Sequence, residues 1–307
     1  MIHIACNIDE RFAQHCAVTL VSAFKNNPGQ AITAHIIARG LTESSRRRLA
    51  ELAAAYGATL RFYEPAPDLL DGFSIRKCGN RISITAYYRC LLPELLPADV
   101  DRVLYLDCDI LVLSPLSPLW DTPLDGVAAG VVEDIANDDA PRYARLEYPQ
   151  ELGYFNSGVL LLNLSYWREH RLADACRDLM HHHPERIVYN DQDLLNCVLC
   201  RSKRALPLVW NVQDAFYRRP AQLTTAWRDK YAEALLHPAI LHYSNRKPWL
   251  YDSQHPLRRL YHDYLALTPW AGATAGRSAA DAVKRFVRLL PFRLGLRRPK
   301  YVDLSKL

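Results

Sequence analysis

A run of apolar residues that ends in two carboxylates places the strongest constraint on how this chain can fold. The run begins at Arg102, continues as Val-Leu-Tyr-Leu, and reaches Asp107 and Asp109 with Cys108 between them. Apolar residues of high strand propensity predict a buried strand. Carboxylates spaced by two project to the same side of an extended backbone, where they repel each other unless a cation sits between them. The pair therefore favours a divalent-cation site with oxygen ligands over the simpler interpretation, a strand end with two solvated acids.

Length and composition allow one large α/β domain with an appendage, or two domains, for the 307 residues. The sequence has no apolar run long enough to span a membrane, and Met1 to Asn7 lack the basic and apolar regions of a signal peptide. The eight cysteines are scattered, mostly in apolar stretches, which predicts buried, reduced thiols. Cys197 and Cys200 have the spacing of a zinc or redox pair, but their apolar neighbours favour a core helix.

Strands and helices alternate in the first part of the chain. We expect strands at 2–8, 32–38 and 59–63, and helices at about 12–26 and 42–56, the second capped by Thr42 and closed by Gly57. This alternation predicts a parallel sheet of the doubly wound kind, in which ligands bind at the carboxyl ends of the strands. Asp9 follows the first strand and Asp109 the fourth, so we expect both at that edge of the sheet.

The middle of the chain continues this pattern with longer polar interruptions. Residues 64–82 are predicted to be a loop, and 135–152 an irregular segment that is a candidate lid over a ligand. Further elements are expected as helices at 84–95, 167–183, from 190 onward and at 256–264, and as strands at 127–132, 155–163 and 239–243.

The basic charge of this protein is concentrated near the C-terminal end of the sequence. Eight basic residues and one acid lie between Arg277 and Lys300, whereas the whole chain has a net charge of +5. One helical face of this segment gathers apolar side chains, namely Val283, Phe286, Val287 and Leu290. Such a segment is typical of binding to an anionic membrane surface. A disordered solubilising tail is the alternative, and no fold for recognising nucleic acid accompanies the basic residues.

Several short motifs in a fixed order carry a family resemblance. They are Ile8-Asp9-Glu10, Ile84-Thr85-Ala86-Tyr87-Tyr88-Arg89, Tyr105-Leu106-Asp107-Cys108-Asp109, Phe155-Asn156-Ser157-Gly158, Asp191-Gln192-Asp193, and His242 followed by Lys247-Pro248-Trp249. Together they resemble family 8 of the retaining glycosyltransferases, in particular bacterial lipopolysaccharide glucosyl- and galactosyltransferases. The resemblance covers residues 2 to about 270. It implies an α/β GT-A fold, with a Rossmann-like, mostly parallel central sheet flanked by helices.

We therefore expect a glycosyltransferase domain at 1–250 and a helical region at 251–307 that ends in the basic, membrane-associating tail. The resemblance also implies a UDP-hexose donor and a manganese ion, with magnesium as the alternative. The metal ligands would be Asp107, Asp109 and His242, since carboxylates with one imidazole suit manganese. The donor site would take in Asn7, Ile8 and Asp9 at the uracil and ribose, Arg89 at the sugar or its phosphate, Lys247 at the pyrophosphate, and also Cys108, Asn156 and Ser157.

Three further residues are expected to take part in the chemistry. Asp191 and Gln192 would stabilise the positively charged sugar, and whether either acts as a nucleophile is left open by the sequence. Asp134 would bind donor or acceptor hydroxyls, or would be no more than a loop acid. Purely structural interpretations exist for three of the site residues as well. They are His242 as a structural residue at a strand end, Arg89 as the buried ion-pair partner of a carboxylate, and Asp191 as a helix cap.

Two positions depart from the family pattern. Asn245 stands where glycine is common, in a turn that is one residue short, and this affects the role expected of Lys247. Arg11 stands where asparagine is common, which affects the expected contacts with the ribose.

The function implied by the resemblance is transfer of glucose or galactose from UDP to a glycan or lipid-linked saccharide, with the lipopolysaccharide or lipooligosaccharide core as the expected acceptor. The enzyme would be cytoplasmic and peripheral on the inner face of the membrane. A glycogenin-like self-glucosylating enzyme and a non-catalytic membrane-surface scaffold are alternatives. A phosphohydrolase of the haloacid dehalogenase type also uses D-x-D, but its motif continues with Gly and Thr, whereas Ile110 and Leu111 follow here.

Overall fold

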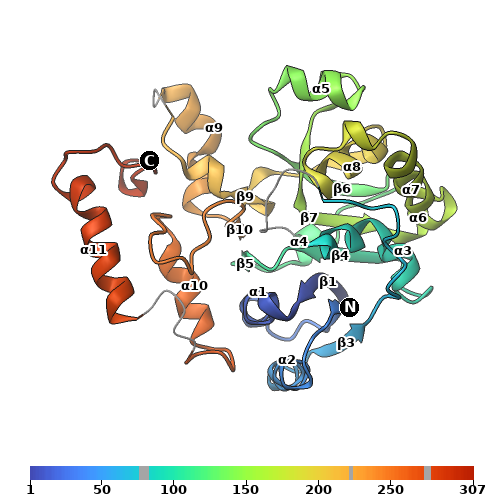
Figure 1. Cartoon of the computed structure of the whole chain (residues 1–307), viewed down its shortest axis with the longest axis horizontal. Helices are drawn as coiled ribbons and strands as arrows, with labels where there is room; N and C mark the ends of the chain where they lie inside the picture. The colour runs from blue at the N-terminus through green and yellow to red at the C-terminus, as the bar shows by residue number, and fades with distance from the viewer. Residues whose placement is uncertain (76–82, 221–223, 273–277) are drawn as a thin grey trace.

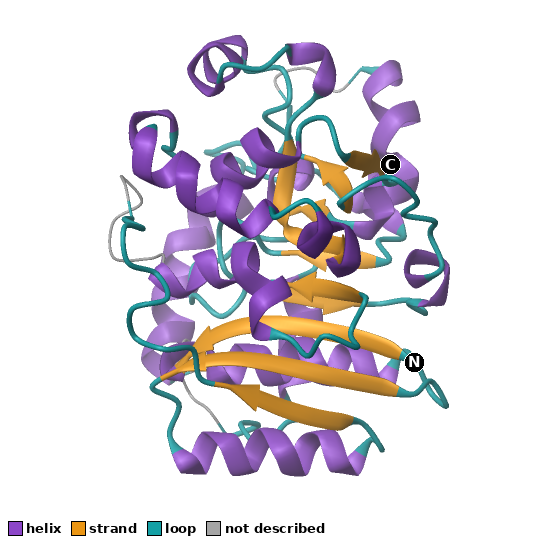
Figure 2. Ribbon diagram, turned by 90° about the vertical axis from the view of Figure 1, so that its right-hand side faces the viewer, coloured by secondary structure: helices purple, strands orange, loops and turns teal. Residues whose placement is uncertain are grey.

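The computed structural model describes residues 1–75, 83–220, 224–272 and 278–307. Cys78, part of the loop expected at 64–82, and Arg277 lie outside these residues. Helices cover both faces of a seven-stranded sheet (Figure 1, Figure 2). The sheet has the strand order β3-β2-β1-β4-β7-β6-β8, with β1 at Ile2–Asp9, β2 at Ile32–Arg39, β3 at Thr59–Tyr63, β4 at Arg102–Leu106, β6 at Ala129–Glu133, β7 at Phe155–Asn163 and β8 at Lys203–Ala205.

The first strands and the helices between them form as the sequence predicts. β1 pairs in parallel with β2 and β4, and β2 with β3. The connecting helices are α1 (Ala13–Lys25) and α2 (Glu43–Ala55). The Thr42 side chain accepts a hydrogen bond from the Ser45 amide at the start of α2, and Gly57, just past its end, has a φ of 68°. Side-chain caps and left-handed glycines complete helix ends, so local sequence determines these boundaries.

β7 reverses the chain direction in the middle of the sheet. It pairs antiparallel with β4 and β6, whereas β6 and β8 are parallel. All of β7 is buried up to its last residue, Asn163, which agrees with its continuous apolar sequence. The sheet is therefore mostly parallel, as predicted.

A second, three-stranded sheet brings distant parts of the chain together. Its order is β5-β10-β9, with β5 at Ile110–Val112, β10 at Ile240–His242 and β9 at Val212–Gln213. β10 runs antiparallel to β5, so that His242 lies opposite Ile110. This pairing places the His242 imidazole next to Asp109, which directly precedes β5.

The strand predicted to carry both carboxylates is interrupted. β4 ends at Leu106, and Asp107 follows it outside the strand, whereas Cys108 and Asp109 lie in a turn before β5. The backbone amide of Asp107 still donates to the Gly158 carbonyl at 2.9 Å, whereas the Asp109 carbonyl accepts from the Tyr243 amide at 3.0 Å. The chain therefore leaves the large sheet and joins the small one between the two carboxylates.

Three other segments differ from the sequence prediction. Residues 135–152, expected to be irregular, contain the helix α5 (Ala140–Leu146), which buries Tyr143 and Leu146. The helix expected at 167–183 is split into α6 (Leu164–Glu169) and α7 (Leu172–His182) by Arg171, whose φ is 51°. The segment 84–95 is mostly a 3-10 helix (η3, Ile84–Leu91), followed by one short helix, α3 (Leu92–Leu95). Helices and strands that the sequence did not predict are α4 (Ser117–Trp120), β8, β9 and α9 (Thr225–Leu236).

Two later helices pack against elements that carry the site or lie beside it. α8 (Asn190–Leu199) begins where the sequence predicts a helix and packs on η3 and β7. α10 (Arg258–Leu265) buries Tyr261 and Leu265 in the cluster that includes Val18 of α1. Residues beyond 250 therefore share a core with the N-terminal part of the chain.

The last helix, α11 (Ala279–Arg293), lies at the edge of the molecule, on the left of Figure 1. Its Arg285 side chain donates to the Tyr251 carbonyl at 2.8 Å, so the basic side of the helix contacts the body of the protein. Across the residues that the structure describes, there is no helix whose length and apolar character would allow it to cross a membrane.

Two buried histidines make the stability of this fold depend on pH. Burial lowers the pKa of His15 and of His255 to about 3, from 6.5. Between these values the unfolded chain binds protons that the folded chain does not, so the free energy of unfolding falls as the pH decreases below about 6.5. For one histidine the expected loss between pH 6.5 and pH 5 is about 2 kcal/mol. Urea titrations across this range should show the loss, and His255→Gln should reduce it; an unchanged pH dependence in that variant would contradict the assignment.

Candidate active site

One cavity of about 540 Å³ gathers every side chain that the sequence predicts for the site. It lies at the carboxyl ends of β1 and β4, where doubly wound sheets bind their ligands. The predicted residues in its wall are Asn7, Ile8, Asp9, Arg89, Asp107, Cys108, Asp109, Asp134, Asn156, Ser157, Asp191, Gln192, His242 and Lys247. The structure therefore brings the whole predicted set together, although it comes from segments far apart in the sequence.

Asp107, Asp109 and His242 form a group that could hold a divalent metal ion. Their ligand atoms all lie within 4.8 Å of one another. The His242 Nε2 atom is 3.2 Å from a carboxylate oxygen of Asp109 and 3.8 Å from one of Asp107. Two carboxylates and one imidazole are suitable ligands for a hard or borderline divalent cation such as Mg²⁺ or Mn²⁺.

Asn211 fixes the orientation of the His242 ring. His242 Nδ1 lies 2.9 Å from the Asn211 side-chain oxygen, which can only accept, so Nδ1 carries the proton. The lone pair of Nε2 is then directed at the two carboxylates, as metal binding requires. The Asn211 amide in turn donates to the Asn156 side-chain oxygen at 2.9 Å, which connects the metal group to the sugar side of the cavity.

Gly158 allows the close approach of the metal group. β7 pairs with β6 through Leu160 and then through Asn156, so residues 157–159 form a bulge beside the site. A Cβ atom on Gly158 would lie 2.3 Å from the His242 ring and 2.8 Å from an Asp107 oxygen. A side chain at this position would displace both ligands, so the glycine is a requirement of the site.

Arg89, in the cavity wall, joins two of the predicted acids. Its guanidinium lies 2.8 Å from Asp107 and 3.2 Å from Asp191. It also donates to the Ser157 carbonyl at 2.8 Å and lies over the Tyr105 ring. Burial would lower the pKa of Arg89, but the two carboxylates outweigh it and raise that pKa. The alternative considered from sequence, a buried ion-pair partner, therefore describes its contacts, and it is compatible with a place in the cavity wall.

The two buried carboxylates Asp109 and Asp191 differ in pKa because their neighbours differ. Burial raises the pKa of Asp191, and the Arg89 guanidinium offsets only part of this rise. Burial acts on Asp109 in the same direction, but Lys247 and His242 outweigh it and hold the pKa of Asp109 well below its usual range. Asp109 is therefore ionised at neutral pH, as a metal ligand must be.

On the opposite wall, Asp134, Asn156 and Gln192 form one hydrogen-bonded set. The Asp134 carboxylate accepts from the side-chain amides of Asn156 and Gln192, both at 3.2 Å. The Gln192 oxygen accepts from Asn156 at 3.0 Å and from the Ser157 amide at 3.2 Å. Asp191, one residue earlier, accepts from the Ser157 hydroxyl at 2.8 Å. These contacts fix donors and acceptors around a space that suits sugar hydroxyls.

The two departures from the family pattern have visible consequences. Arg11 donates to the Asp9 carboxylate at 2.8 Å, so the acid expected at the ribose already has a cationic partner. Lys247 binds the Asp109 carboxylate and donates to the Tyr243 carbonyl at 3.0 Å, so the short turn still brings its ammonium group to the cavity.

The side-chain amide of Asn7 has no hydrogen-bond partner within the described part of the chain, although its oxygen and nitrogen atoms are buried. A buried, unpaired amide of this kind is suited to binding a ligand.

Comparison with known proteins decides the family. The profile of the family described as Glycosyl transferase family 8 matches residues 3–253. The chain belongs to glycosyl transferase family 8. Its mostly parallel sheet flanked by helices is the GT-A fold: the galactosyltransferase LgtC, solved with donor and acceptor sugar analogues, superposes with a TM-score of 0.78 at 27% identity and covers 88% of this chain and 99% of its own.

Curated relatives of this family 8 glycosyltransferase share about a quarter of its residues. General stress protein A of Bacillus subtilis (strain 168) is 28% identical, over 88% of this chain and 95% of that protein. The lipopolysaccharide 1,2-glucosyltransferase of Escherichia coli (strain K12) is 26% identical, over 94% of this chain and 85% of that protein. The lipopolysaccharide 1,3-galactosyltransferase of Salmonella typhimurium (strain LT2) is 25% identical, over 88% and 79%.

Some residues in or beside the cavity were not predicted. Tyr105 donates its hydroxyl to Asp107 at 2.9 Å, and strand alternation could have found it, since it stands two residues before Asp107. Arg142 lies over the Tyr189 ring in the cavity wall, on the helix α5 that the sequence did not predict. Asn211 belongs to no motif, and nothing in the sequence points to its contact with His242.

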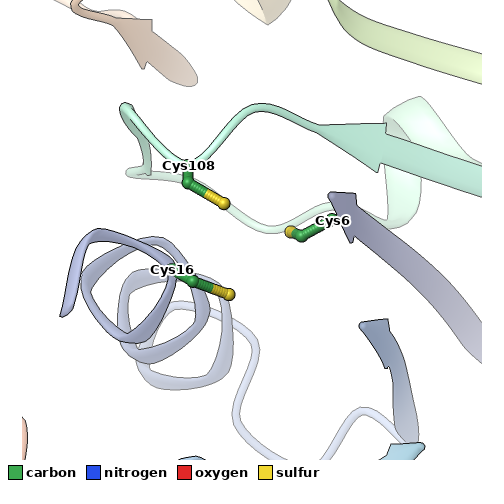
Figure 3. A group of neighbouring side chains, drawn as sticks. All are labelled: Cys6, Cys16 and Cys108. Atoms are coloured by element: carbon green, nitrogen blue, oxygen red, sulfur yellow. The ribbon is translucent and has the colours of Figure 1, made fainter. Parts of the chain in front are cut away.

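The thiol of Cys108 belongs to a buried group below the cavity. Figure 3 shows its sulfur directed toward Cys6 and Cys16, and the three sulfurs lie within 4.8 Å of one another. If Cys108 contacts the UDP-sugar, we therefore expect the contact to come from its backbone and not from its thiol.

The contact between Asn211 and His242 gives a test of the metal group. We expect Asn211→Ala to weaken Mn²⁺ binding by about 10- to 100-fold, because His242 loses the acceptor that orients its ring. Isothermal titration calorimetry on the purified protein measures this affinity. Gln213→Ala is the matched control, since the Gln213 amide lies in the same wall but donates to the backbone carbonyls of Glu133 at 2.9 Å and of Asn211 at 3.4 Å rather than to the His242 ring. Equal Mn²⁺ affinity of Asn211→Ala and the unaltered protein would show that Asn211 does not support the site.

Proposed function

We propose that this protein is a retaining hexosyltransferase that moves glucose or galactose from a UDP-sugar to a saccharide acceptor with the help of Mn²⁺, or alternatively Mg²⁺. The observation that carries the proposal is the convergence of Asp107, Asp109 and His242 in one cavity wall. Family membership supplies the reaction class, and the donor set of these three side chains supplies the choice of ion.

The wall around this group is suited to a diphosphate leaving group. A divalent ion held there would act as a Lewis acid on the negative charge that develops as the bond to the sugar breaks. The Lys247 ammonium, held beside it by Asp109 and the Tyr243 carbonyl, adds a second positive charge. Asn7 would use its unpaired amide on the uracil, and Asp9 would lie at the ribose.

The opposite wall would bind and orient the hexose. Asn156, Gln192 and Asp134 would exchange hydrogen bonds with its hydroxyls, and Ser157 would hold Asp191 in place. A positive charge that develops on the sugar would be stabilised by the Asp191 carboxylate and by the Gln192 oxygen. Arg89 balances the charge of Asp191 and would contact the donor through the same guanidinium.

The relatives suggest the acceptor. Two of them are named lipopolysaccharide glucosyl- and galactosyltransferases, which favours the lipopolysaccharide or lipooligosaccharide core. Self-glucosylation, as in glycogenin, is the second candidate, and a non-catalytic scaffold the third.

The outer face of α11 supports an association with membranes. Val283, Phe286 and Val287 are 63%, 52% and 61% exposed, whereas Arg285 and Arg288 on the other side contact residues 251–253. An exposed apolar stripe beside arginine and lysine is typical of helices that lie on anionic lipid. We propose that the enzyme binds at the inner face of the cytoplasmic membrane, with residues 251–307 as its docking region.

The catalytic proposal is tested by hexosyl transfer. We expect UDP release from UDP-glucose or UDP-galactose in the presence of Mn²⁺ and of lipopolysaccharide core saccharide, and its loss in EDTA. Asp109→Asn should lower kcat/KM by about a hundredfold or more, because it removes a charged metal ligand.

Asp125→Asn, an exposed acid on another surface, is the control and should keep full activity. Turnover that survives EDTA and Asp109→Asn would contradict the metal site. An increase in the mass of the protein without added acceptor would favour self-glucosylation, and absence of UDP binding would favour the scaffold.

The membrane proposal is tested with vesicles that contain phosphatidylglycerol. The double variant Phe286→Ser, Val287→Ser should co-sediment several-fold less than the unaltered protein, because it removes apolar area from the exposed stripe. Tyr56→Ser, which removes a 40% exposed aromatic ring elsewhere, should bind as before. Equal sedimentation of all three proteins would rule out docking through α11.

A further inference from the structure

The cavity lined by Asp107, Asp109 and His242 is called the donor cavity below. A second cavity lies beside it, and the proposed reaction makes no use of this second cavity. Its volume is about 560 Å³, which is within the usual range of small-molecule sites. Asn245 lines both cavities, so the two are neighbours. Six cationic side chains stand in the wall of the second cavity: Arg218, Arg219, Arg246, Arg288, Arg297 and Lys300. We call it the basic cavity.

Half of these cations are already paired. Asp252, the carboxylate in the wall, is bound by Arg246 and by Arg288, the latter at 3.3 Å. Arg218 lies 3.2 Å from Asp214, which is fully buried behind the wall. These pairs hold three guanidinium groups in position around the cavity.

The other half have no such partner. Arg219, Arg297 and Lys300 make no ion pair with any residue that the structure describes. Three unpaired positive charges around a concave space attract an anion, and arginine binds phosphate or carboxylate oxygens with paired hydrogen bonds. The excess of positive charge therefore belongs to the cavity itself and not only to the outer surface of the tail.

The C-terminal segment builds this cavity by returning to the body of the protein. The Arg219 amide donates to the Lys300 carbonyl at 2.9 Å, and Arg218 and Tyr301 form a β-bridge. The Tyr301 hydroxyl donates to the buried Asp214 carboxylate at 2.7 Å. Tyr301 and Phe292 give the wall an apolar part, which can pack against the carbon atoms of a sugar ring.

We propose that the basic cavity binds a phosphate-bearing sugar of the acceptor saccharide. This rests on the proposed function, since it assigns the cavity to the acceptor. Its position next to Asn245, two residues before Lys247, would let one oligosaccharide reach from the bound phosphate to the donor sugar. Membrane docking through the exposed stripe of α11 is a separate surface, on the outer side of the same helix.

The test uses the full-length protein with glucose 6-phosphate as the probe, in the presence of excess UDP and Mn²⁺ so that the donor cavity is filled. Ligand-observed NMR should show saturable binding of glucose 6-phosphate and none of glucose. The double variant Arg297→Gln, Lys300→Gln should bind the probe about tenfold more weakly, since it removes two charged hydrogen-bond donors.

The matched control is Arg293→Gln, Arg298→Gln, which removes the same charge from the same segment without altering the cavity wall. It should keep the affinity for glucose 6-phosphate within about twofold, because charges exposed outside the cavity contribute little. Absence of saturable binding, or an equal loss in both double variants, would overturn the proposal. Both should lose affinity for phosphatidylglycerol vesicles to the same extent; a loss confined to the cavity variant, without binding of the sugar phosphate, would identify a lipid headgroup as the occupant instead.

Failure of the proposed function would look different. Binding of glucose 6-phosphate is measured without turnover, so it can be specific while hexosyl transfer is absent. In that case the anion site would stand, and its assignment to an acceptor would be wrong.

Discussion

The contacts of one guanidinium group hold the site together. Arg89, on η3, contacts Asp107 after β4, Asp191 on α8 and the Ser157 carbonyl of β7. Each of these elements also supplies other residues of the cavity wall. Taking charged groups out of water costs several kcal/mol for each ion unless partners surround it, so loss of one partner would leave the others buried and unpaired. The positions of the Asp107–Asp109 segment, of the bulge in β7 and of the start of α8 therefore depend on one another through Arg89.

The sequence predicted most of the fold because its signals are local. Caps, apolar runs and glycines determine β1, α1, β2, α2 and β7, and these elements agree with the prediction. The structure differs from the prediction where tertiary contacts determine the local conformation. The helix α5 forms where its Tyr143 and Leu146 pack in a buried cluster with Tyr148 and Tyr154. The chain also turns between Asp107 and Asp109 to enter a second sheet. Neither event has a periodic signature in the sequence.

The sequence predicted the residues that line the cavity more completely than the contacts between them. Motif order identified the five acids of the cavity wall and most of its amides, but not Gln213. It also did not show that Arg11 binds Asp9 or that Asn211 orients His242. The same holds for the C-terminal helix α11. The sequence showed that α11 has an apolar and a basic face, but not which face contacts the body of the protein. That depends on contacts of Arg285 and Arg288 with residues 251–253.

The hydrogen bond between Tyr301 and Asp214 also affects the order in which the protein can fold during translation. The two residues are 87 positions apart, so a ribosome that adds 5 to 20 residues per second makes Tyr301 about 4 to 17 s after Asp214. During this interval the Asp214 carboxylate has neither the Tyr301 hydroxyl nor the cover of the C-terminal segment. The donor cavity, made from residues up to Lys247, can therefore form during translation before the basic cavity exists. The nascent protein would acquire its two cavities in sequence, the donor cavity first.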